Sequence, residues 1–249
     1  MASRILDPGF SLTIQSREVE SFIRCPMRSH LAKKNNVITD LKTELNKSLD
    51  STLTYTFVKT SVGLNPNTND MITFFDQRFV YPEEDVRQIY VQEGSKILNE
   101  FYKNFDAFKK KFEFVHPPFE LEYANHGVTI KILVNAIVKT KPSSGLPITK
   151  YLFFDYSKSM NNTWSSYSRL WASVAKQILL NNGISTIETG AFHIASGKLM
   201  SPKVTLKNNS TEYLDSVCLL LATKAKHPVY SGSCFRCLAQ AECAAEITF

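Results

Sequence analysis

Long apolar runs, leader patterns and repeats are missing from this sequence. No apolar run approaches the roughly 18 residues that a membrane-spanning helix needs. The first eight residues hold no charged segment followed by an apolar one, so no secretory leader is expected. The 249 residues contain no internal repeat and no low-complexity tract. These absences exclude the membrane and fibrous classes, and we expect a soluble, intracellular protein with no membrane partner.

Recognisable histidine motifs are also missing. None of the five histidines lies at a spacing typical of a metal site or a catalytic triad. We therefore expect them to be ordinary surface or core residues. They are His30, His116, His126, His193 and His227.

The composition is that of an ordinary globular protein with a mild positive charge. Hydrophobic residues make up 43% of the chain and aromatic residues 12%, which predicts a real core. The net charge of +6 suits a polyanionic partner such as nucleic acid, and suits equally a solvated basic surface. The lysines at 109–111 can instead complement the dipole of a helix end. The candidates for contacts with a nucleic-acid backbone are Lys33, Lys34, Lys109, Lys110, Lys111 and Lys158.

Four of the five cysteines lie near the two ends of the chain. Cys234, Cys237 and Cys243 follow the spacing C-x2-C-x5-C, and Cys25 precedes Pro26. A two-residue gap lets neighbouring thiolates bind one metal or cluster, and a proline that begins a helix fixes where the preceding side chain points. We therefore predict one site made of four thiols, which could hold an iron-sulfur cluster, hold zinc or form disulfides. The odd cysteine count favours a reducing compartment, and Cys218 is predicted to be a core residue of an amphipathic helix.

Hydrophobic periodicity changes from helical to extended near residue 111 and then alternates. We predict one α/β domain over 1–249, with a mainly helical part at 1–110, a sheet core at 111–225 and a cysteine tail at 226–249. Helices are expected from Ser16 as N-cap, from Pro26, over about 38–57, after Pro82 to about 111, over about 164–181 and over 210–224, with a loop at 61–70. Strands are expected at 112–115, 119–123, 128–140, 151–156, 187–194 and 203–207.

The cysteine pattern and this order of elements resemble the iron-sulfur branch of the RecB-like PD-(D/E)XK nucleases, which includes the AddB nuclease domain and CRISPR-associated exonucleases. In that family four cysteines hold a [4Fe-4S] cluster that joins the C-terminal tail to the N-terminal helix. The resemblance implies a restriction-endonuclease-like fold, with a mixed central sheet flanked by helices. It also implies a [4Fe-4S] cluster on Cys25, Cys234, Cys237 and Cys243.

The two strand motifs that bind metal in this family are altered here. Ile132-Leu-Val-Asn135-Ala-Ile137 matches the first motif, with Asn135 in the place of the metal-binding aspartate. Phe153-Phe154-Asp155-Tyr156-Ser157-Lys158 matches the second, with Ser157 in the place of the lysine. Lys158 should point to the opposite face unless a bulge resets the register.

Two further family positions also differ. Leu98 stands where the family has a histidine four residues after a glycine, here Gly94, and Tyr167 stands where it has a glutamine. Of the expected polar positions only Asp155 remains, and Glu122 is an additional carboxylate on a preceding strand. The selective loss predicts a protein that keeps the fold and the cluster but not the nuclease chemistry.

The leading hypothesis is a catalytically inactive protein of the nuclease fold that binds nucleic acid, most readily DNA, or serves as a subunit of a DNA-processing assembly. One alternative is an active magnesium- or manganese-dependent single-strand DNA exonuclease that uses Asp155, Asn135, Glu122 and a register-shifted Lys158. Another is a structural or interaction protein in which the same cysteines bind zinc. The many Asn, Lys and Thr residues and the altered motifs would suit a viral accessory protein in the cytoplasm of a host cell.

Overall fold

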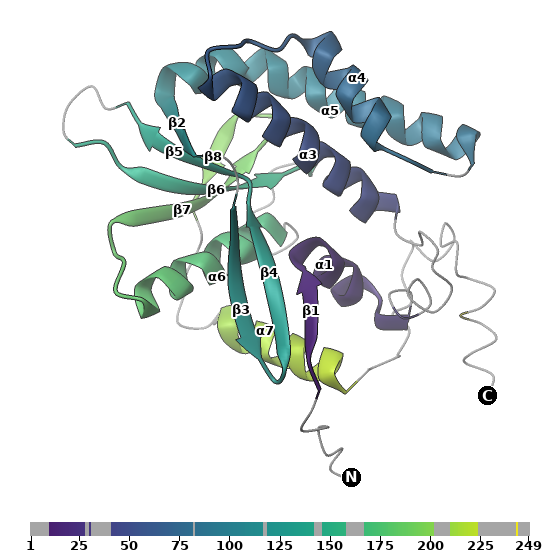
Figure 1. Ribbon diagram of the computed structural model, residues 1–249, viewed down its shortest axis with the longest axis vertical. Helices are drawn as coiled ribbons and strands as arrows, with labels where there is room; N and C mark the ends of the chain where they lie inside the picture. The colour runs from purple at the N-terminus through teal and green to yellow at the C-terminus, as the bar shows by residue number, and fades with distance from the viewer. Residues whose placement is uncertain are drawn as a thin grey trace. The chain divides into compact units, whose positions relative to one another are not determined.

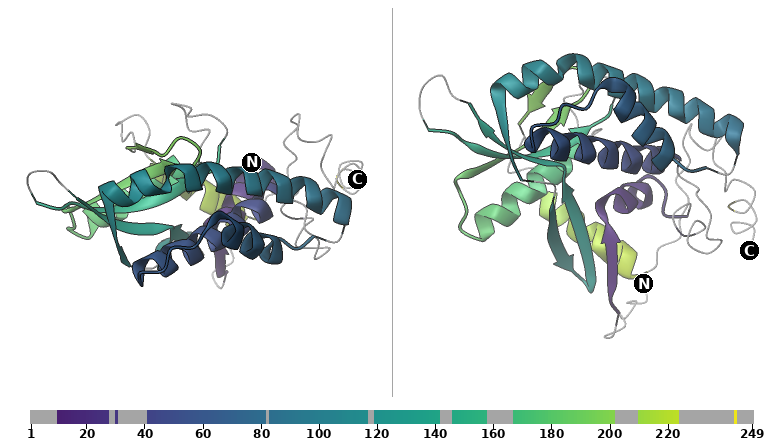
Figure 2. Two further views of the ribbon diagram at one scale, coloured as in Figure 1. Left: turned by 90° about the horizontal axis from the view of Figure 1, so that it is seen from above. Right: turned by 45° about the horizontal axis from the view of Figure 1, so that its top comes forward.

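The computed structural model describes most of the chain and divides it into two compact units. The described residues are 10–27, 30, 41–81, 83–116, 119–141, 146–157, 167–201, 210–223 and 243. The first unit combines the segments Met1–Glu44, Glu122–Ile132 and Glu212–Phe249, and the second combines Leu45–Leu121 and Leu133–Thr211. Figure 1 labels the helices and strands, and Figure 2 shows the same ribbon from two further directions.

A five-stranded mixed sheet lies at the centre of the second unit (Figure 1). Its order is β2-β5-β6-β7-β8; β6 and β7 are parallel, and the other neighbouring pairs are antiparallel. Helix α6 (Tyr167–Asn181) connects the parallel pair, since parallel strands need a crossover. The arrangement confirms the predicted mixed α/β class. The strands are β2 (Phe112–His116), β5 (Ala136–Thr140), β6 (Thr149–Asp155), β7 (Ile187–His193) and β8 (Lys198–Met200).

Helices cover both faces of this sheet. On one face Phe154 of β6 packs against Phe57 of α3 (Leu41–Ser61), with ring centroids 5.3 Å apart. On the other face the Thr189 hydroxyl of β7 donates to the backbone oxygen of Ala172 in α6, at 2.7 Å. Alternation of side chains along the strands produces these two faces, because Thr189 is in register with Tyr151 and not with Phe154.

Helix α3 confirms the predicted apolar stripe and extends beyond it. Leu45, Leu49 and Leu53 are fully buried. The threonines after Asp50 were expected to weaken the helix, but it continues to Ser61. Thr52 and Thr56 are buried, and their hydroxyls donate to backbone oxygens four residues earlier at 2.8 and 2.9 Å. Tertiary burial therefore outweighs the modest helix propensity of threonine.

Helix α4 (Thr68–Arg78) was not predicted, and the loop expected at 61–70 is correspondingly shorter. Its start is fixed by a reciprocal capping box. The side-chain oxygen Oδ1 of Asn67 accepts from the Asp70 backbone N–H at 2.9 Å, and the Asp70 carboxylate accepts from the Asn67 backbone N–H at 3.2 Å. Helix α5 (Glu84–Lys111) follows, close to the range expected after Pro82.

The single strand predicted over 128–140 is wrong, because the chain forms two strands in two different sheets. β4 (Val128–Val134) belongs to a three-stranded sheet, and β5 belongs to the five-stranded one. Asn135 lies between them and is in neither strand. Periodicity alone could not reveal the change, since the residues on both sides of Asn135, Ile132–Val134 and Ala136–Val138, are apolar.

The first unit contains helix α1 (Ser16–Arg24), helix α7 (Ser210–Ala222) and most of the three-stranded sheet, whose order is β1-β4-β3. β1 (Leu12–Gln15) was not predicted, and it pairs in parallel with β4. β3 (Phe119–Asn125) is joined to β4 by a turn at His126 and Gly127, both with positive φ. The helix was expected to have Ser16 as N-cap, but the cap is Gln15, whose side chain forms a capping box with Glu18.

Several other predictions can be compared with the described residues. The helices expected over 164–181 and 210–224 correspond to α6 and α7, and Cys218 is fully buried in α7 as predicted. The strand expected at 203–207 lies outside the described residues, whereas β8 was not predicted. Across the described ranges, no helix has both the length and the apolar character needed to cross a membrane.

Candidate functional site

Asn135 forms buried hydrogen bonds at the point where the chain leaves one sheet for the other. Its backbone N–H donates to the Leu152 oxygen at 3.0 Å, and its side-chain oxygen accepts from the Phe154 backbone N–H at 2.8 Å. Its amide group donates to the Asp50 carboxylate at 2.8 Å, and the residue is only 2% exposed. The Asn135 side chain thus satisfies the backbone N–H of Phe154 in β6, which would otherwise need a backbone oxygen of a neighbouring strand.

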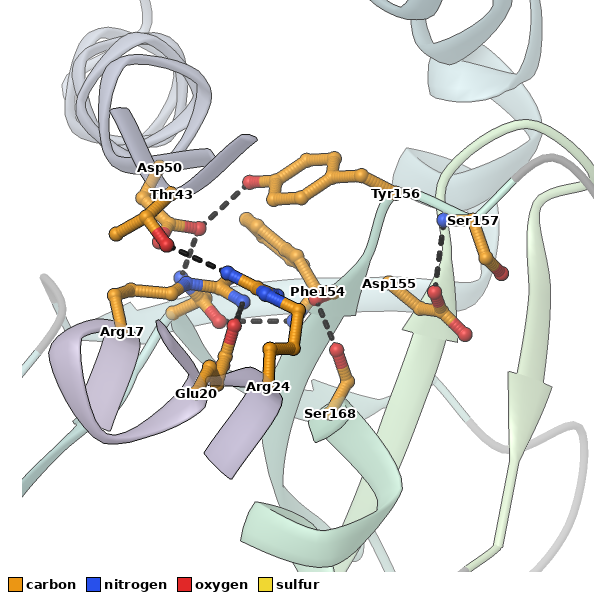
Figure 3. A network of polar contacts seen from close by, with 11 residues as sticks. Arg17, Glu20, Arg24, Thr43, Asp50, Phe154, Asp155, Tyr156, Ser157 and Ser168 are labelled. Atoms are coloured by element: carbon orange, nitrogen blue, oxygen red, sulfur yellow. Dashed lines mark hydrogen bonds and ion pairs between the residues drawn. The ribbon is translucent and has the colours of Figure 1, made fainter. Parts of the chain in front are cut away.

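Asp50 is the acceptor at the centre of this network (Figure 3). The hydroxyl of Tyr156 donates to its carboxylate at 2.7 Å, beside the bond from Asn135. Asp50 lies on the buried side of α3 and is itself buried. Sequence analysis missed this residue, although a charge beside the fully buried Leu49 and Leu53 was a signal that an internal partner exists.

Asp155, which sequence analysis matched to the acidic residue of the second motif, ends strand β6. One carboxylate oxygen accepts from the Ser157 backbone N–H two residues later, at 2.9 Å, which is an Asx turn (Figure 3). The residue is 4% exposed, and its other oxygen, Oδ2, has no hydrogen-bond partner among the described residues. Asp155 therefore has a structural role at the strand end and one buried oxygen that the fold does not use.

His193 lies next to Asp155, with which it is in register on the parallel strand β7. Its Nε2 is 2.8 Å from the Ser157 backbone oxygen, which can only accept, so Nε2 carries the proton. Its Nδ1 is then free of a proton in the neutral ring and accepts from the Ser196 hydroxyl at 2.8 Å. His193 is 3% exposed, which fits the predicted core histidine. No sequence spacing indicated its position beside Asp155.

A cavity of about 440 Å³ opens beside the ends of these strands. Its walls come from one side of α5, from the residues that follow β6 and from the turn after β7. Two carboxylates of α5, those of Glu93 and Glu100, and the Lys96 side chain contribute to the wall. The lining includes Glu93, Lys96, Glu100, Tyr156, Ser157 and Ile194. Sequence analysis had not identified it.

The other predicted positions of the nuclease centre are distributed as follows. Leu98 is fully buried, so the family's histidine position is occupied by a core residue. Glu122 is exposed on β3 and belongs to the first unit, whereas Asn135, Asp155 and Ser157 belong to the second. Lys158 lies outside the described residues.

Two of the four predicted cysteine ligands are described, and they share one neighbour. Cys25 follows α1 in an extended conformation, and its backbone N–H donates to the Ser21 oxygen at 3.0 Å. Pro26 and Met27 are helical, as predicted. Cys25 and Cys243, which are 218 positions apart in the sequence, are both partly buried against the side chain of Met27. Cys234 and Cys237 lie outside the described residues.

The predicted basic residues are described in part. Lys109, Lys110 and Lys111 form the last turn of α5. Lys33 and Lys34, like Lys158, lie outside the described residues. Within the described ranges, no group of three or more His, Cys, Asp or Glu side chains is arranged to hold a metal ion.

Comparisons with known proteins give no family assignment. The chain matches no protein-family model and no curated protein sequence.

Proposed function

We propose that this chain is an inactive relative of the RecB-like nucleases, which keeps an iron-sulfur cluster and binds nucleic acid. The observation that carries the proposal is the use of Asn135. At the position of the family's metal-binding aspartate, both polar ends of a neutral amide are engaged in buried hydrogen bonds, to Asp50 and to the Phe154 backbone N–H. Coordination of a divalent ion by this residue would break bonds that the sheet needs.

The second motif supports the same conclusion. A hydrolytic centre of this kind requires hard oxygen ligands and a group that positions the attacking water. Ser157 carries no charge, and its backbone oxygen accepts from His193. Asp155 uses one oxygen in the turn to Ser157. The residues at these positions do not fit a magnesium or manganese centre, and we assign them no step of hydrolysis.

The cysteines suit a cluster better than the nuclease residues suit a metal. Cys25 and Cys243 come from the two ends of the chain, and both pack on Met27. Thiolates at this spacing, with Cys234 and Cys237, form a ligand set appropriate to a [4Fe-4S] cluster or to zinc. When bound, such a group would join the tail to the segment that follows α1.

The proposal is tested by one titration and one incubation on the same protein. Fluorescence anisotropy with labelled single-stranded DNA should show saturable binding. Incubation of the same DNA with manganese or magnesium should leave it intact. Failure to bind any single-stranded or duplex DNA would contradict the binding role, and metal-dependent shortening of the DNA would contradict the inactive centre.

The active exonuclease remains the second candidate because of one observation, the buried Oδ2 of Asp155 that has no hydrogen-bond partner among the described residues. Such an oxygen is costly to bury and suits a cation. This candidate predicts manganese-dependent degradation of single-stranded DNA ends that disappears in Asp155→Ala, provided that the variant folds.

A further inference from the structure

The C-terminal end of α5 and the residue that follows β5 form one basic surface, which we call the lysine patch: Lys109, Lys110, Lys111 and Lys141. Sequence analysis identified the first three only. The Lys141 backbone N–H donates to the Lys111 oxygen at 2.8 Å, and its ammonium donates to the Lys109 oxygen at 3.1 Å. These two bonds bring the end of β5 onto the end of the helix.

The patch is basic beyond what the helix end requires. Lys141 satisfies two of the terminal carbonyl oxygens of α5, which is the usual role of a cation at this position. Lys109 pairs with the Asp106 carboxylate at 2.9 Å and lies over the Phe105 ring. Segments 106–113 and 139–141 together carry five lysines and two carboxylates.

The side chains of Lys110 and Lys111 take no part in the hydrogen bonds and the ion pair just described. Both are exposed, and within the described part of the chain neither side chain makes a hydrogen bond or an ion pair; the Lys111 backbone oxygen accepts from Lys141. They directly follow Lys109 in the last turn of α5, and the Lys141 backbone bonds to Lys111, so an anion at this surface meets several positive charges. A polyanion gains more from such a surface than a single ion does, because each neutralised phosphate releases a counterion.

The aromatic rings of α5 nearest to the patch are not exposed. Phe105 and Phe108, the rings nearest to the patch on α5, are buried in the core of the second unit. Base stacking needs an exposed ring face. We therefore propose that the lysine patch contacts the phosphate backbone of single-stranded DNA, without preference for base sequence. This inference rests on the proposed nucleic-acid binding and assigns a surface to it.

The test measures binding of a labelled oligothymidylate of about 20 nucleotides over a range of salt concentrations. In the double variant Lys110→Gln/Lys111→Gln, two phosphate contacts are lost. The slope of log K against log salt should become shallower by about 1.4, at about 0.7 per contact, and affinity at 50 mM salt should fall about tenfold or more.

The matched control is Lys103→Gln/Lys198→Gln, which removes the same charge from exposed positions elsewhere in the second unit. It should change affinity less than about twofold if the contacts are localised. Urea denaturation should give nearly the same midpoint for both variants and the parent protein. Lys110 and Lys111 are exposed, and the control loses only the exposed ion pair of Lys103 with Glu100.

The outcomes separate the two claims. Binding by the parent protein that the Lys110/Lys111 variant retains in full would overturn the lysine patch and leave the proposed function in place. Equal loss in both variants would also overturn it, since net charge and not position would then matter. No binding by the parent protein would overturn both. An oligothymidylate and a mixed-sequence strand should bind alike, and a strong preference would contradict the backbone contact.

Discussion

Asn135→Asp introduces the aspartate that the proposed nuclease motif would carry, and it should make the protein markedly less stable. The substitution removes the N–H donor that bonds to Asp50 at 2.8 Å and places a second carboxylate against the first. Both positions are buried, so water cannot screen the repulsion. Breaking a buried, hydrogen-bonded polar pair so that a charge remains unpaired costs about 3–5 kcal/mol. For a urea m value of about 2 kcal/mol/M, the unfolding midpoint should fall by about 2 M.

The loss should depend on pH in a defined direction. Two carboxylates that share one site cannot both be charged easily, so the new carboxyl at position 135 takes up a proton more readily in the folded chain than in the unfolded chain. The penalty is therefore fully present at neutral pH and decreases as pH falls toward 4. Urea unfolding followed by the fluorescence of Trp171, which is buried in α6, would report both effects.

Two variants make the interpretation specific. Exchange of the pair, Asp50→Asn with Asn135→Asp, restores one amide donor and one carboxylate and should recover at least half of the lost stability. Asn67→Asp makes the same chemical change at the exposed N-cap of α4 and should stay within about 0.5 kcal/mol of the parent protein. Unchanged stability in Asn135→Asp, or a loss that the exchange deepens, would refute the structural role of Asn135.

Three further perturbations follow from the packing, and each is checked by denaturation. Tyr156→Phe removes the donor to the Asp50 network and should cost about 1.5–3 kcal/mol, whereas Tyr102→Phe at an exposed site of α5 should cost almost nothing; equal losses would contradict this. Gly94→Ala would place a methyl group 2.2 Å from the Phe75 ring, and it should destabilise the protein by about 1–3 kcal/mol, whereas alanine in place of glycine usually stabilises a helix. Adding Phe75→Leu should recover part of this loss. Burial, and then the charge of Asp215, raises the pKa of the Cys218 thiol from 9.0 to about 11. The unfolded thiol loses its proton first, so stability is constant below pH 9 and falls between pH 9 and 11 by up to about 2.7 kcal/mol; an identical alkaline loss in Cys218→Ala would contradict this.

Regular patterns made most of the element order predictable. The leucines of α3 repeat at four-residue steps, and all three described members of that stripe from Leu45 to Leu53 are buried. The predicted strands at 112–115 and 151–156 correspond closely to β2 and β6 because β-branched and aromatic residues gather there between turn signals. Local propensity and tertiary packing agree in these segments.

The sequence predictions fail in two places. In one, a side chain makes the hydrogen bonds that a strand backbone would make; in the other, a capping box starts a helix in a segment whose composition predicts a loop. Asn135 interrupts a continuous apolar run because its amide forms bonds that a strand would otherwise make. Helix α4 begins in a segment rich in turn residues because Asn67 and Asp70 cap each other. Neither of these effects produces a regular repeat of hydrophobic residues, so analysis of hydrophobic periodicity could not detect them.

Sequence analysis identified some residues of the candidate site but not their arrangement. It singled out Asn135 and Ser157 as altered positions of the proposed motifs and Asp155 as the unaltered one. It gave no indication that Asp50, 85 positions earlier, accepts from the Asn135 amide, or that His193 lies in register with Asp155. Such partners depend on sheet register and helix placement, which single-sequence patterns do not define.

The measurement that tests the account most directly is iron, sulfide and zinc analysis of anaerobically purified protein, read together with its absorbance near 400 nm. The account predicts about four iron and four sulfide per chain and a brown colour that Cys25→Ala or Cys243→Ala abolishes, whereas Cys218→Ala retains it. About one zinc per chain without iron, or a colourless and stable protein with neither metal, would contradict the claim that the two ends are joined by an iron-sulfur cluster.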